Sequence, residues 1–534
     1  MRDTMKQNSN NSARHAPHTL AASIARQAKQ RPDQVAINCE SRQVSYERLH
    51  RESNRSAHAL RATGLGPGDR VAYLGKESEH YYEIVFGCAK SGTVLVPINW
   101  RLTPGEVDHI LRDSDTRLLF VEREFASIAE QVGPSLPTLR TIVALDSVQA
   151  RAAGFQAWKA DQPDTDPDRI ADPADPVVQI YTSGTTGLPK GVVLPNLSFF
   201  TFGAAMVEHG LDWLDWRPED ISLISLPGFQ IAGLSWSMQG FAAGVTNVVM
   251  RMFVSQEALE LIDRLGVTIT FVAPAMLQML LAEPTACPAS FRSLRKVVYG
   301  GSPISQTLLR QCLDVISCEF LQIYASTETG NVAVCLPPAD HYPGSPLLGA
   351  AGKAYPGVDV KIVDELGRML PAGEVGEICV RTSAHMLEYW RLPKATSQTL
   401  VDGWIHTGDA GYLNEDEYLF VGDRIKEMII VAGQNVYPAE VEDVLTRHPS
   451  VADVAVIGIP DERWGEAIHA CVVLRPGERA TPRELMVSLK GRLADFKIPT
   501  SYDFVEGLPR NPTGKVLRRT LREPFWRHLD RQIN

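Results

Sequence analysis

Apolar residues along most of the chain alternate between the spacing typical of helices and the spacing typical of strands. Residues 19–30 and 46–60 carry apolar positions at helical intervals. Short apolar runs with the length of buried strands lie between and after these segments, at 35–37, 70–74, 94–97, 117–121 and 177–181. Repeated alternation of helix and strand predicts a layered α/β domain.

Two breaks interrupt this pattern. Residues 161–176 are rich in aspartate and proline, which sustain neither a helix nor a central strand, so we expect this segment to run over the surface. The second break lies near Asp423, and a separate set of elements follows it. The expected elements are strands at 427–431, 454–459 and 470–474 and helices at 438–447 and 482–496. The chain is therefore predicted to end in a small α+β domain.

Composition narrows the class of protein. A chain of 534 residues is too long for one ordinary core, and its 44% hydrophobic and 22% charged residues are typical of a globular enzyme. The net charge of −10 disfavours a nucleic-acid partner. The 8 cysteines are scattered without a CxxC pair. With neither a signal peptide in residues 1–16 nor an apolar run long enough for a transmembrane segment, we expect a cytoplasmic protein.

The strongest local signal is residues 181–191, which read YTSGTTGLPKG directly after an expected strand. Small residues and hydroxyls leave backbone N–H groups free to cradle phosphates, and Lys190 adds a cation. Pro189 before this lysine and Gly191 after it exclude a Walker A loop. The expected phosphate-binding residues are Thr182, Ser183, Gly184, Thr185, Thr186, Gly187 and Lys190. A plain surface turn is the alternative.

The segment resembles the phosphate loop of the adenylate-forming superfamily, which includes acyl-CoA synthetases, peptide-synthetase adenylation domains and firefly luciferase. Further motifs similar to those of this superfamily follow in the same order, at 299–303, 324–328, 407–409, 422–426 and 511–515. The resemblance covers about residues 20–520. It implies an AMP-forming acyl-CoA ligase, in which a carboxylic acid and ATP give an acyl-adenylate and pyrophosphate. The thiol of coenzyme A, the expected co-substrate, then yields acyl-CoA and AMP.

The resemblance also implies roles for individual residues, and the chemistry of each side chain suits its role. Glu328 supplies a carboxylate oxygen, the ligand that Mg²⁺ prefers, and Thr182 is the second expected metal ligand. Lys515 would neutralise charge that builds as the acid attacks the α-phosphate. Thr327 and Lys190 are expected to take part in catalysis with Glu328 and Lys515. The other residues expected to contact the nucleotide or pantetheine are Gly301, Ser302, Pro303, Tyr324, Asp409, Arg424 and Gly433. Tyr324 offers a flat ring to adenine, although such a residue alone would more often belong to the core.

The two half-reactions need different surroundings for the α-phosphate. The resemblance implies that the C-terminal domain rotates between them about Lys426. The expected division is a disordered N-terminus at 1–17, an N-terminal ATP- and acid-binding domain at 18–422, a hinge at 423–426, and a mobile C-terminal lid at 427–534 that carries the catalytic lysine. A homodimer is possible on the same resemblance.

The segment 226–234 looks like the acyl-site motif of the superfamily. The expected pocket residues are Phe229, Gln230, Ala232, Gly233 and Gly300. Gln230 stands where the superfamily commonly has histidine, and a second common histidine is missing near Asn196. Because Gly and Ala leave room, the sequence predicts a medium- or long-chain fatty acid, with an alicyclic, steroid-derived or aromatic acid as the alternative.

Two rival functions use parts of the same pattern. An amino-acid adenylation domain that serves a carrier protein normally has an aspartate near the acyl motif, and residues 229–232 contain no acid. A non-catalytic nucleotide-binding protein is disfavoured because Lys190, Glu328, Asp409 and Lys515 are all present.

Overall fold

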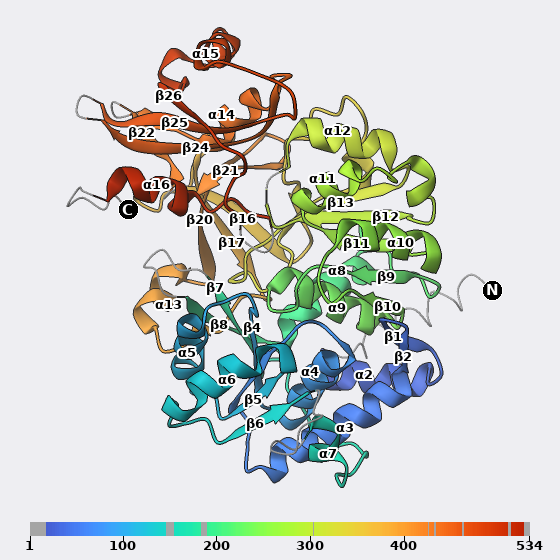
Figure 1. Ribbon diagram of the computed structural model, residues 1–534. Coiled ribbons are helices and arrows are strands. Elements are labelled where there is room, and N and C mark those ends of the chain that lie inside the picture. The colour runs from blue at the N-terminus through green and yellow to red at the C-terminus, as the bar shows by residue number, and fades with distance from the viewer. Residues whose placement is uncertain are drawn as a thin grey trace.

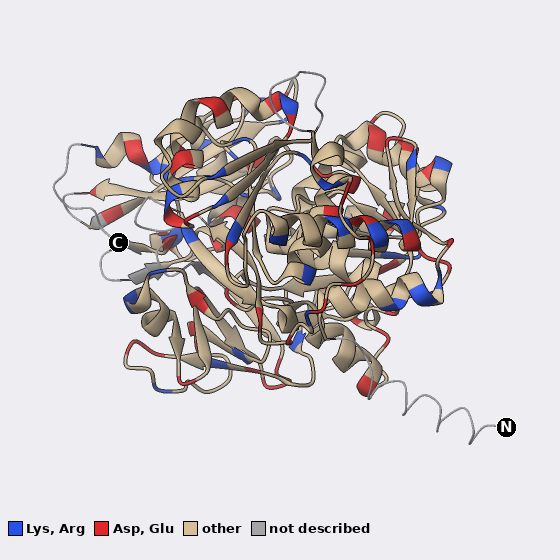
Figure 2. Ribbon diagram, turned by 90° about the horizontal axis from the view of Figure 1, so that it is seen from below, with Lys and Arg blue, Asp and Glu red and all other residues tan. Residues whose placement is uncertain are grey.

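The computed structural model describes residues 18–145, 154–182, 189–302, 304–424, 427–431, 434–461, 464–510 and 514–527. In Figure 1 the deep-orange and red elements that follow residue 427 gather in the upper part of the molecule, above the blue N-terminal part, whereas the lighter orange α13 (Pro393–Thr399) lies lower in the view. No helix in these ranges is long and apolar enough to cross a membrane. Basic and acidic segments of the described chain are interspersed in the view of Figure 2. The predicted α/β class, with a large N-terminal and a smaller C-terminal domain, is confirmed.

The first sheet has the strand order β15-β14-β13-β12-β11-β9-β10-β1-β2. Its central neighbours, from β13 to β1, are parallel, and β2, β14 and β15 add antiparallel edges. Its strands are β1 (Val35–Cys39), β2 (Arg42–Ser45), β9 (Ile221–Ile224), β10 (Thr246–Val249), β11 (Ile269–Val272), β12 (Lys296–Gly300), β13 (Glu319–Tyr324), β14 (Val334–Leu336) and β15 (Lys353–Ala354). Because parallel strands are covered on both faces, they read as short continuous apolar runs.

The second sheet has the order β18-β8-β7-β4-β3-β5-β6. Its strands are β3 (Arg70–Leu74), β4 (Val94–Ile98), β5 (Leu118–Val121), β6 (Thr141–Ala144), β7 (Pro176–Thr182), β8 (Lys190–Pro195) and β18 (Glu388–Tyr389). β7 and β8 are antiparallel, and the short β18 extends the edge beyond β8. The predicted strands up to residue 181 are therefore all present, most of them one or two residues longer than expected.

Two further sheets follow along the chain. The third has the order β16-β17-β20-β19, with β21 paired to β20. Its strands are β16 (Val358–Val363), β17 (Gly376–Thr382), β19 (Leu400–Val401), β20 (Trp404–Leu413) and β21 (Leu419–Arg424). The fourth forms the core of the C-terminal domain with strands β22 (Ile429–Val431), β23 (Gln434–Val436), β24 (Val451–Asp461), β25 (Gly465–Leu474) and β26 (Ser501–Phe504).

Several helices begin at a residue whose side chain caps the first turn. Thr19 accepts a hydrogen bond from the backbone of the first turn of α2, and Thr103 and Glu106 form a capping box at α5. The helices of the N-terminal part are α2 (Leu20–Gln30), α3 (Tyr46–Ala62), α4 (Glu79–Ser91), α5 (Pro104–Asp113), α6 (Ala126–Val132), α7 (Phe155–Lys159), α8 (Thr201–Glu208), α9 (Ile231–Ala243), α10 (Ser255–Leu265), α11 (Pro274–Ala282), α12 (Gln306–Val315) and α13 (Pro393–Thr399). The C-terminal helices are α14 (Pro438–Leu445), α15 (Pro482–Leu489) and α16 (Arg518–Trp526).

One predicted helix is too long. The expected helix at 482–496 ends as α15 at Leu489, because Lys490 is already extended, with φ −61° and ψ 133°. Gly491 follows with a left-handed φ of 73°, and a short 3₁₀ turn comes at Asp495–Lys497. The irregular path predicted for residues 161–176 is confirmed, since neither helix nor strand forms there before β7 begins. In this stretch Asp164 accepts hydrogen bonds from Arg51 of α3, so the segment runs along that helix.

Candidate functional site

The motifs meet at one edge of the first sheet. β9, β11, β12 and β13 are parallel neighbours, so their carboxyl ends lie side by side. The acyl motif follows β9, α11 follows β11, the Gly301 turn follows β12, and the segment with Glu328 follows β13. The crevice outside the carboxyl ends of such strands is where open α/β sheets bind ligands.

The phosphate loop joins β7 to β8, and its two ends are held together. Thr182 and Lys190 are paired residues of the two antiparallel strands. The Lys190 ammonium lies 5.0 Å from the ring centroid of Tyr389, a favourable cation–π arrangement. The Tyr389 hydroxyl in turn donates a 2.6 Å hydrogen bond to Oε1 of Glu328. One tyrosine thus connects the loop lysine with the carboxylate that was expected to bind metal.

Sequence reasoning missed Tyr389. It lies 61 residues from Glu328 along the chain, outside every motif, and reaches the site because β18 pairs with β8. Its neighbour Trp390 packs under Arg70, whose guanidinium carbon is 3.4 Å from the ring centroid. No local pattern in the sequence marks this pairing.

The segment around Glu328 has a fixed backbone. The backbone N–H of Met386 donates to the Glu328 carbonyl at 2.9 Å. Gly330 has a φ of 75°, and a Cβ built on it would lie 1.8 Å from the Ala384 carbonyl oxygen, so only glycine fits. Thr327 accepts a hydrogen bond from the Gly330 N–H through its carbonyl. The chain that follows β17 therefore fixes the backbone from which the Glu328 side chain extends.

Asp409 lies on a bulge of β20. Glu377 of β17 pairs with Ala410, whereas Cys379 pairs with His406, so β20 is longer than β17 between these points and bulges at residues 407–409. Gly408 accommodates the bulge with a φ of 70°.

Side chains from both strands fix this bulge. Oε1 of Glu377 accepts a 3.1 Å hydrogen bond from the Gly408 N–H. Thr407 donates its hydroxyl to the Ile378 carbonyl at 2.8 Å and accepts the N–H of Asp409 at 3.1 Å. The geometry holds the Asp409 carboxylate at a defined place beside β13.

The tyrosine and aspartate of two separate motifs are in contact. The Tyr324 hydroxyl donates to Oδ2 of Asp409 at 2.8 Å. Gly301, at the end of β12, has open space where its side chain would be. The backbone of Arg424 pairs with Asp409 across β20 and β21. The structure thus brings together three motifs that are far apart in the sequence.

The acyl motif is anchored by a buried glutamate. The Gly228 N–H donates to Oε1 of Glu77, and the Gly228 carbonyl accepts a 2.7 Å hydrogen bond from the Tyr81 hydroxyl. Burial raises the pKa of Glu77 to about 7. Phe229 is buried, and Gln230 precedes α9 without capping it through its side chain.

Two glycines of the expected acyl pocket lie close to backbone. A Cβ on Gly233 would lie 2.3 Å from the Pro227 carbonyl oxygen, and one on Gly300 would lie 2.3 Å from the Ile323 carbonyl oxygen. Close packing therefore requires glycine at both positions, and their place in an acyl pocket stays a prediction. Asn196, at the second departure from the superfamily pattern, is buried and accepts the N–H of Leu20 at 3.0 Å, so it ties α2 to the sheet.

The loop of the expected catalytic lysine lies against the N-terminal domain. A Cβ on Gly514 would be 2.5 Å from Cβ of Ala275, in the first turn of α11. Lys515 follows directly, at the same sheet edge as the other motifs. Ser183–Gly187, Pro303, Lys426 and Gly433 lie outside the described residues, as does the side chain of Arg424.

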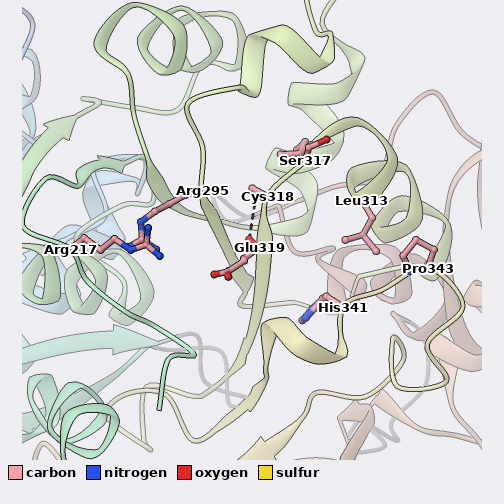
Figure 3. A pocket seen from close by; sticks show the side chains of 9 residues that line it. Arg217, Arg295, Leu313, Ser317, Cys318, Glu319, His341 and Pro343 are labelled. Atoms are coloured by element: carbon pink, nitrogen blue, oxygen red, sulfur yellow. Dashed lines mark hydrogen bonds between the residues drawn. The ribbon is translucent and has the colours of Figure 1, made fainter. Parts of the chain in front are cut away.

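A cavity of about 480 Å³ lies elsewhere (Figure 3). It is at the opposite edge of the sheet, where β12 and β13 begin, and is lined by Cys318, Glu319 and His341 among others. Its Arg295 is already neutralised by Asp215 at 3.0 Å and by Asp220. The charge and position of this cavity do not fit a nucleotide-phosphate site.

Comparisons with known proteins agree with the geometry. The AMP-binding enzyme family profile matches residues 24–390, and the AMP-binding enzyme C-terminal domain profile matches 440–515. The chain is 58% identical over 517 residues to the fatty acid–[acyl-carrier-protein] ligase ScoC of Streptomyces coeruleorubidus, covering 97% of this chain and 98% of that protein. The structure of the anthranilate CoA ligase AuaEII in complex with anthranoyl-AMP matches with a TM-score of 0.88 at 28% identity, covering 96% and 98% of the two chains. ATP-bound MatB from Rhodopseudomonas palustris matches with a TM-score of 0.86 at 28% identity, covering 96% and 100%.

Proposed function

Because this chain belongs to the AMP-binding enzyme family, we propose that it activates a fatty acid as an acyl-adenylate and transfers it to the phosphopantetheine thiol of an acyl carrier protein. The coarser activity, AMP-forming ligation of an acid to a thiol, is that of the family. The observation that carries the finer proposal is the 58% identity to a fatty acid–carrier-protein ligase across 97% of the chain.

The arrangement at the ends of β8 and β13 supports the adenylation step. Lys190 brings a cation to the phosphate loop, while Tyr389 orients Glu328 beside it. Mg²⁺ fits this donor set, because Glu328 offers a carboxylate oxygen and Thr182 a hydroxyl oxygen to a hard cation. When bound, it would neutralise phosphate charge. On the ribose side, Tyr324 holds the carboxylate of Asp409, a group whose oxygens are suited to accept hydroxyl donors.

We assign the transition-state cation to Lys515. As the carboxylate of the acid attacks the α-phosphorus, the bond to pyrophosphate breaks and negative charge accumulates on the phosphate oxygens. A cation placed there lowers the barrier. The contact between Gly514 and Ala275 supports this role, since it brings the loop to the edge where the motifs meet.

The thiol acceptor has a second candidate. The likeness to the anthranilate CoA ligase favours coenzyme A, which carries the same phosphopantetheine thiol as a holo carrier protein. Rotation of the C-terminal domain about Lys426, with Gly433 beside the pantetheine, belongs to this proposal for either acceptor. The domain limits 18–422 and 427–534 belong to it as well.

The decisive experiment separates activation from transfer. The enzyme is incubated with ATP, Mg²⁺ and saturated fatty acids of increasing length, and pyrophosphate release is measured. Transfer is then measured with holo carrier protein, apo carrier protein and coenzyme A at equal concentration. We expect acid-dependent pyrophosphate release and thioester on the holo carrier only. A kcat/KM that is higher for coenzyme A than for the holo carrier protein would identify coenzyme A as the acceptor. If no fatty acid stimulates pyrophosphate release, fatty acids are not the substrates.

A further inference from the structure

Three potential metal ligands lie together beneath the bulge that carries Asp409. Glu377 and Cys379 are two residues apart on β17, so their side chains leave the same face, and His406 is the cross-strand partner of Cys379. Sγ of Cys379 is 3.5 Å from Nδ1 of His406, and this nitrogen is 2.8 Å from Oε2 of Glu377. One ligand atom from each residue lies within 4.8 Å of the other two.

We propose that Glu377, Cys379 and His406 form a regulatory site for a divalent metal ion of the zinc class. A thiolate, an imidazole and a carboxylate are the donors that zinc takes in proteins, with about 2.0–2.3 Å between metal and ligand. The Sγ–Nδ1 separation already suits two ligands of one tetrahedral ion. Only the carboxylate oxygen must move away from the imidazole, and water would occupy the fourth position.

Metal entry and proton release are both possible at this site. The side chains of Glu377 and His406 are each 25% exposed, so an ion reaches them from solvent. Burial raises the pKa of the Cys379 thiol to about 12. Binding of the ion releases the thiol proton to solvent and moves the imidazole proton of His406 from Nδ1, where it is donated to Oε2 of Glu377, to Nε2.

The site is connected to nucleotide binding through one carboxylate. Oε1 of Glu377 accepts the N–H of Gly408, which precedes Asp409 in the bulge. A metal on Oε2 draws charge from the same carboxylate and weakens that hydrogen bond. This consequence rests on the proposed function: if Asp409 holds the ribose, metal binding loosens the residue and raises the KM for ATP.

Binding is tested without reference to activity. The full-length protein is titrated with Co²⁺, and the near-ultraviolet thiolate-to-cobalt absorption is recorded, followed by displacement with Zn²⁺. The test variant is Cys379→Ala. The matched control is Cys471→Ala, which removes another buried cysteine, two residues from His469 on β25 of a different sheet. We expect the absorption in the wild type and the control, and at least about tenfold weaker binding in Cys379→Ala.

A wild-type protein without the thiolate band, or a band unchanged in Cys379→Ala, would overturn the metal site. The coupling is tested separately by measuring pyrophosphate exchange at increasing Zn²⁺ and several ATP concentrations. We expect Zn²⁺ to raise the KM for ATP in the wild type and in Cys471→Ala but not in Cys379→Ala. Equal inhibition of all three would refute the coupling. Absence of any acid-dependent pyrophosphate exchange would instead contradict the proposed function. It would leave the metal site untouched, because the cobalt titration does not depend on activity.

Discussion

Glu77 offers a test of how the acyl motif is held. Its carboxyl is buried at 5% exposure and accepts the N–H of Gly228. Burial raises its pKa from 4.5 to about 7, so folding favours the neutral form. The stabilisation that this group provides is complete below about pH 4.5 and is lost as the pH rises through about 7. Because glutamine stays neutral at every pH, we predict that Glu77→Gln removes this pH-dependent loss of stability.

The magnitude follows from the size of the shift. Each pKa unit corresponds to about 1.4 kcal/mol, so a rise from 4.5 to about 7 is worth about 3 kcal/mol. The free energy of unfolding of Glu77→Gln relative to wild type should increase by about this amount between pH 5 and pH 8. Subtracting the wild type at each pH cancels the contribution of the other titrating groups. The glutamine oxygen can still accept the N–H of Gly228, so acid-dependent pyrophosphate exchange at pH 6 should change little.

The measurement is urea unfolding of both proteins at several pH values, followed by tryptophan fluorescence. Glu83→Gln is the matched control with the opposite expected sign. Burial acts to raise the pKa of Glu83, but His80 and the Lys159 ammonium outweigh it and hold that pKa below its usual value. Removing this charge should cost about 3–5 kcal/mol at neutral pH. A difference between Glu77→Gln and wild type that is constant from pH 5 to pH 8 would refute the reasoning.

Three further substitutions test the site. Lys515→Ala should lower adenylation by about 10²- to 10³-fold with the fold intact, and pyrophosphate exchange near the wild-type rate would contradict the assigned role. Tyr389→Phe removes a hydrogen bond to the charged Glu328 but keeps the ring, so kcat/KM for ATP should fall by a factor that corresponds to about 1.5–3 kcal/mol. Unchanged kinetics at limiting Mg²⁺ would show that the hydroxyl is dispensable. Gly233→Ala should destabilise the protein by about 1–3 kcal/mol without reordering acid preference, because its Cβ would meet the Pro227 carbonyl; a changed order of kcat/KM across the acids would place this position in the pocket.

The sequence was most informative where chemistry is carried by contiguous residues. Lys190, Tyr324, Glu328 and Asp409 each belong to a short motif. The parallel first sheet brings Tyr324 and Glu328 to its edge, while Lys190 and Asp409 come from strands of the second and third sheets. Strands could be predicted because both faces of the central sheets are buried, which makes each strand an apolar run. The helix expected at 482–496 was too long because the chain turns away at Lys490 and Gly491, and apolar spacing alone does not show this turn.

Residues that support the site from a distance could not be predicted. Tyr389 reaches Glu328 through a strand pair, and Glu77 reaches Gly228 across 151 residues. Glu377 meets Gly408 only because β20 bulges at that point. Each of these contacts joins two segments that are far apart in the sequence, and neither segment has a pattern that identifies the other. A single sequence therefore shows only the residue of each pair that belongs to a motif.

The two sides of the site are built differently, and this has a consequence for specificity. Charged and hydrogen-bonded side chains, such as Tyr389 on Glu328 and Tyr324 on Asp409, fix the nucleotide side. The acid side is fixed by backbone, since Gly233 packs α9 directly against the chain that follows β9. Any side chain at Gly233 would meet this backbone and move the helix. We therefore expect the choice of acid to depend on side chains of α9 that face away from Gly233 and on Phe229 and Gln230 before it, which can vary while the adenylation chemistry stays unchanged.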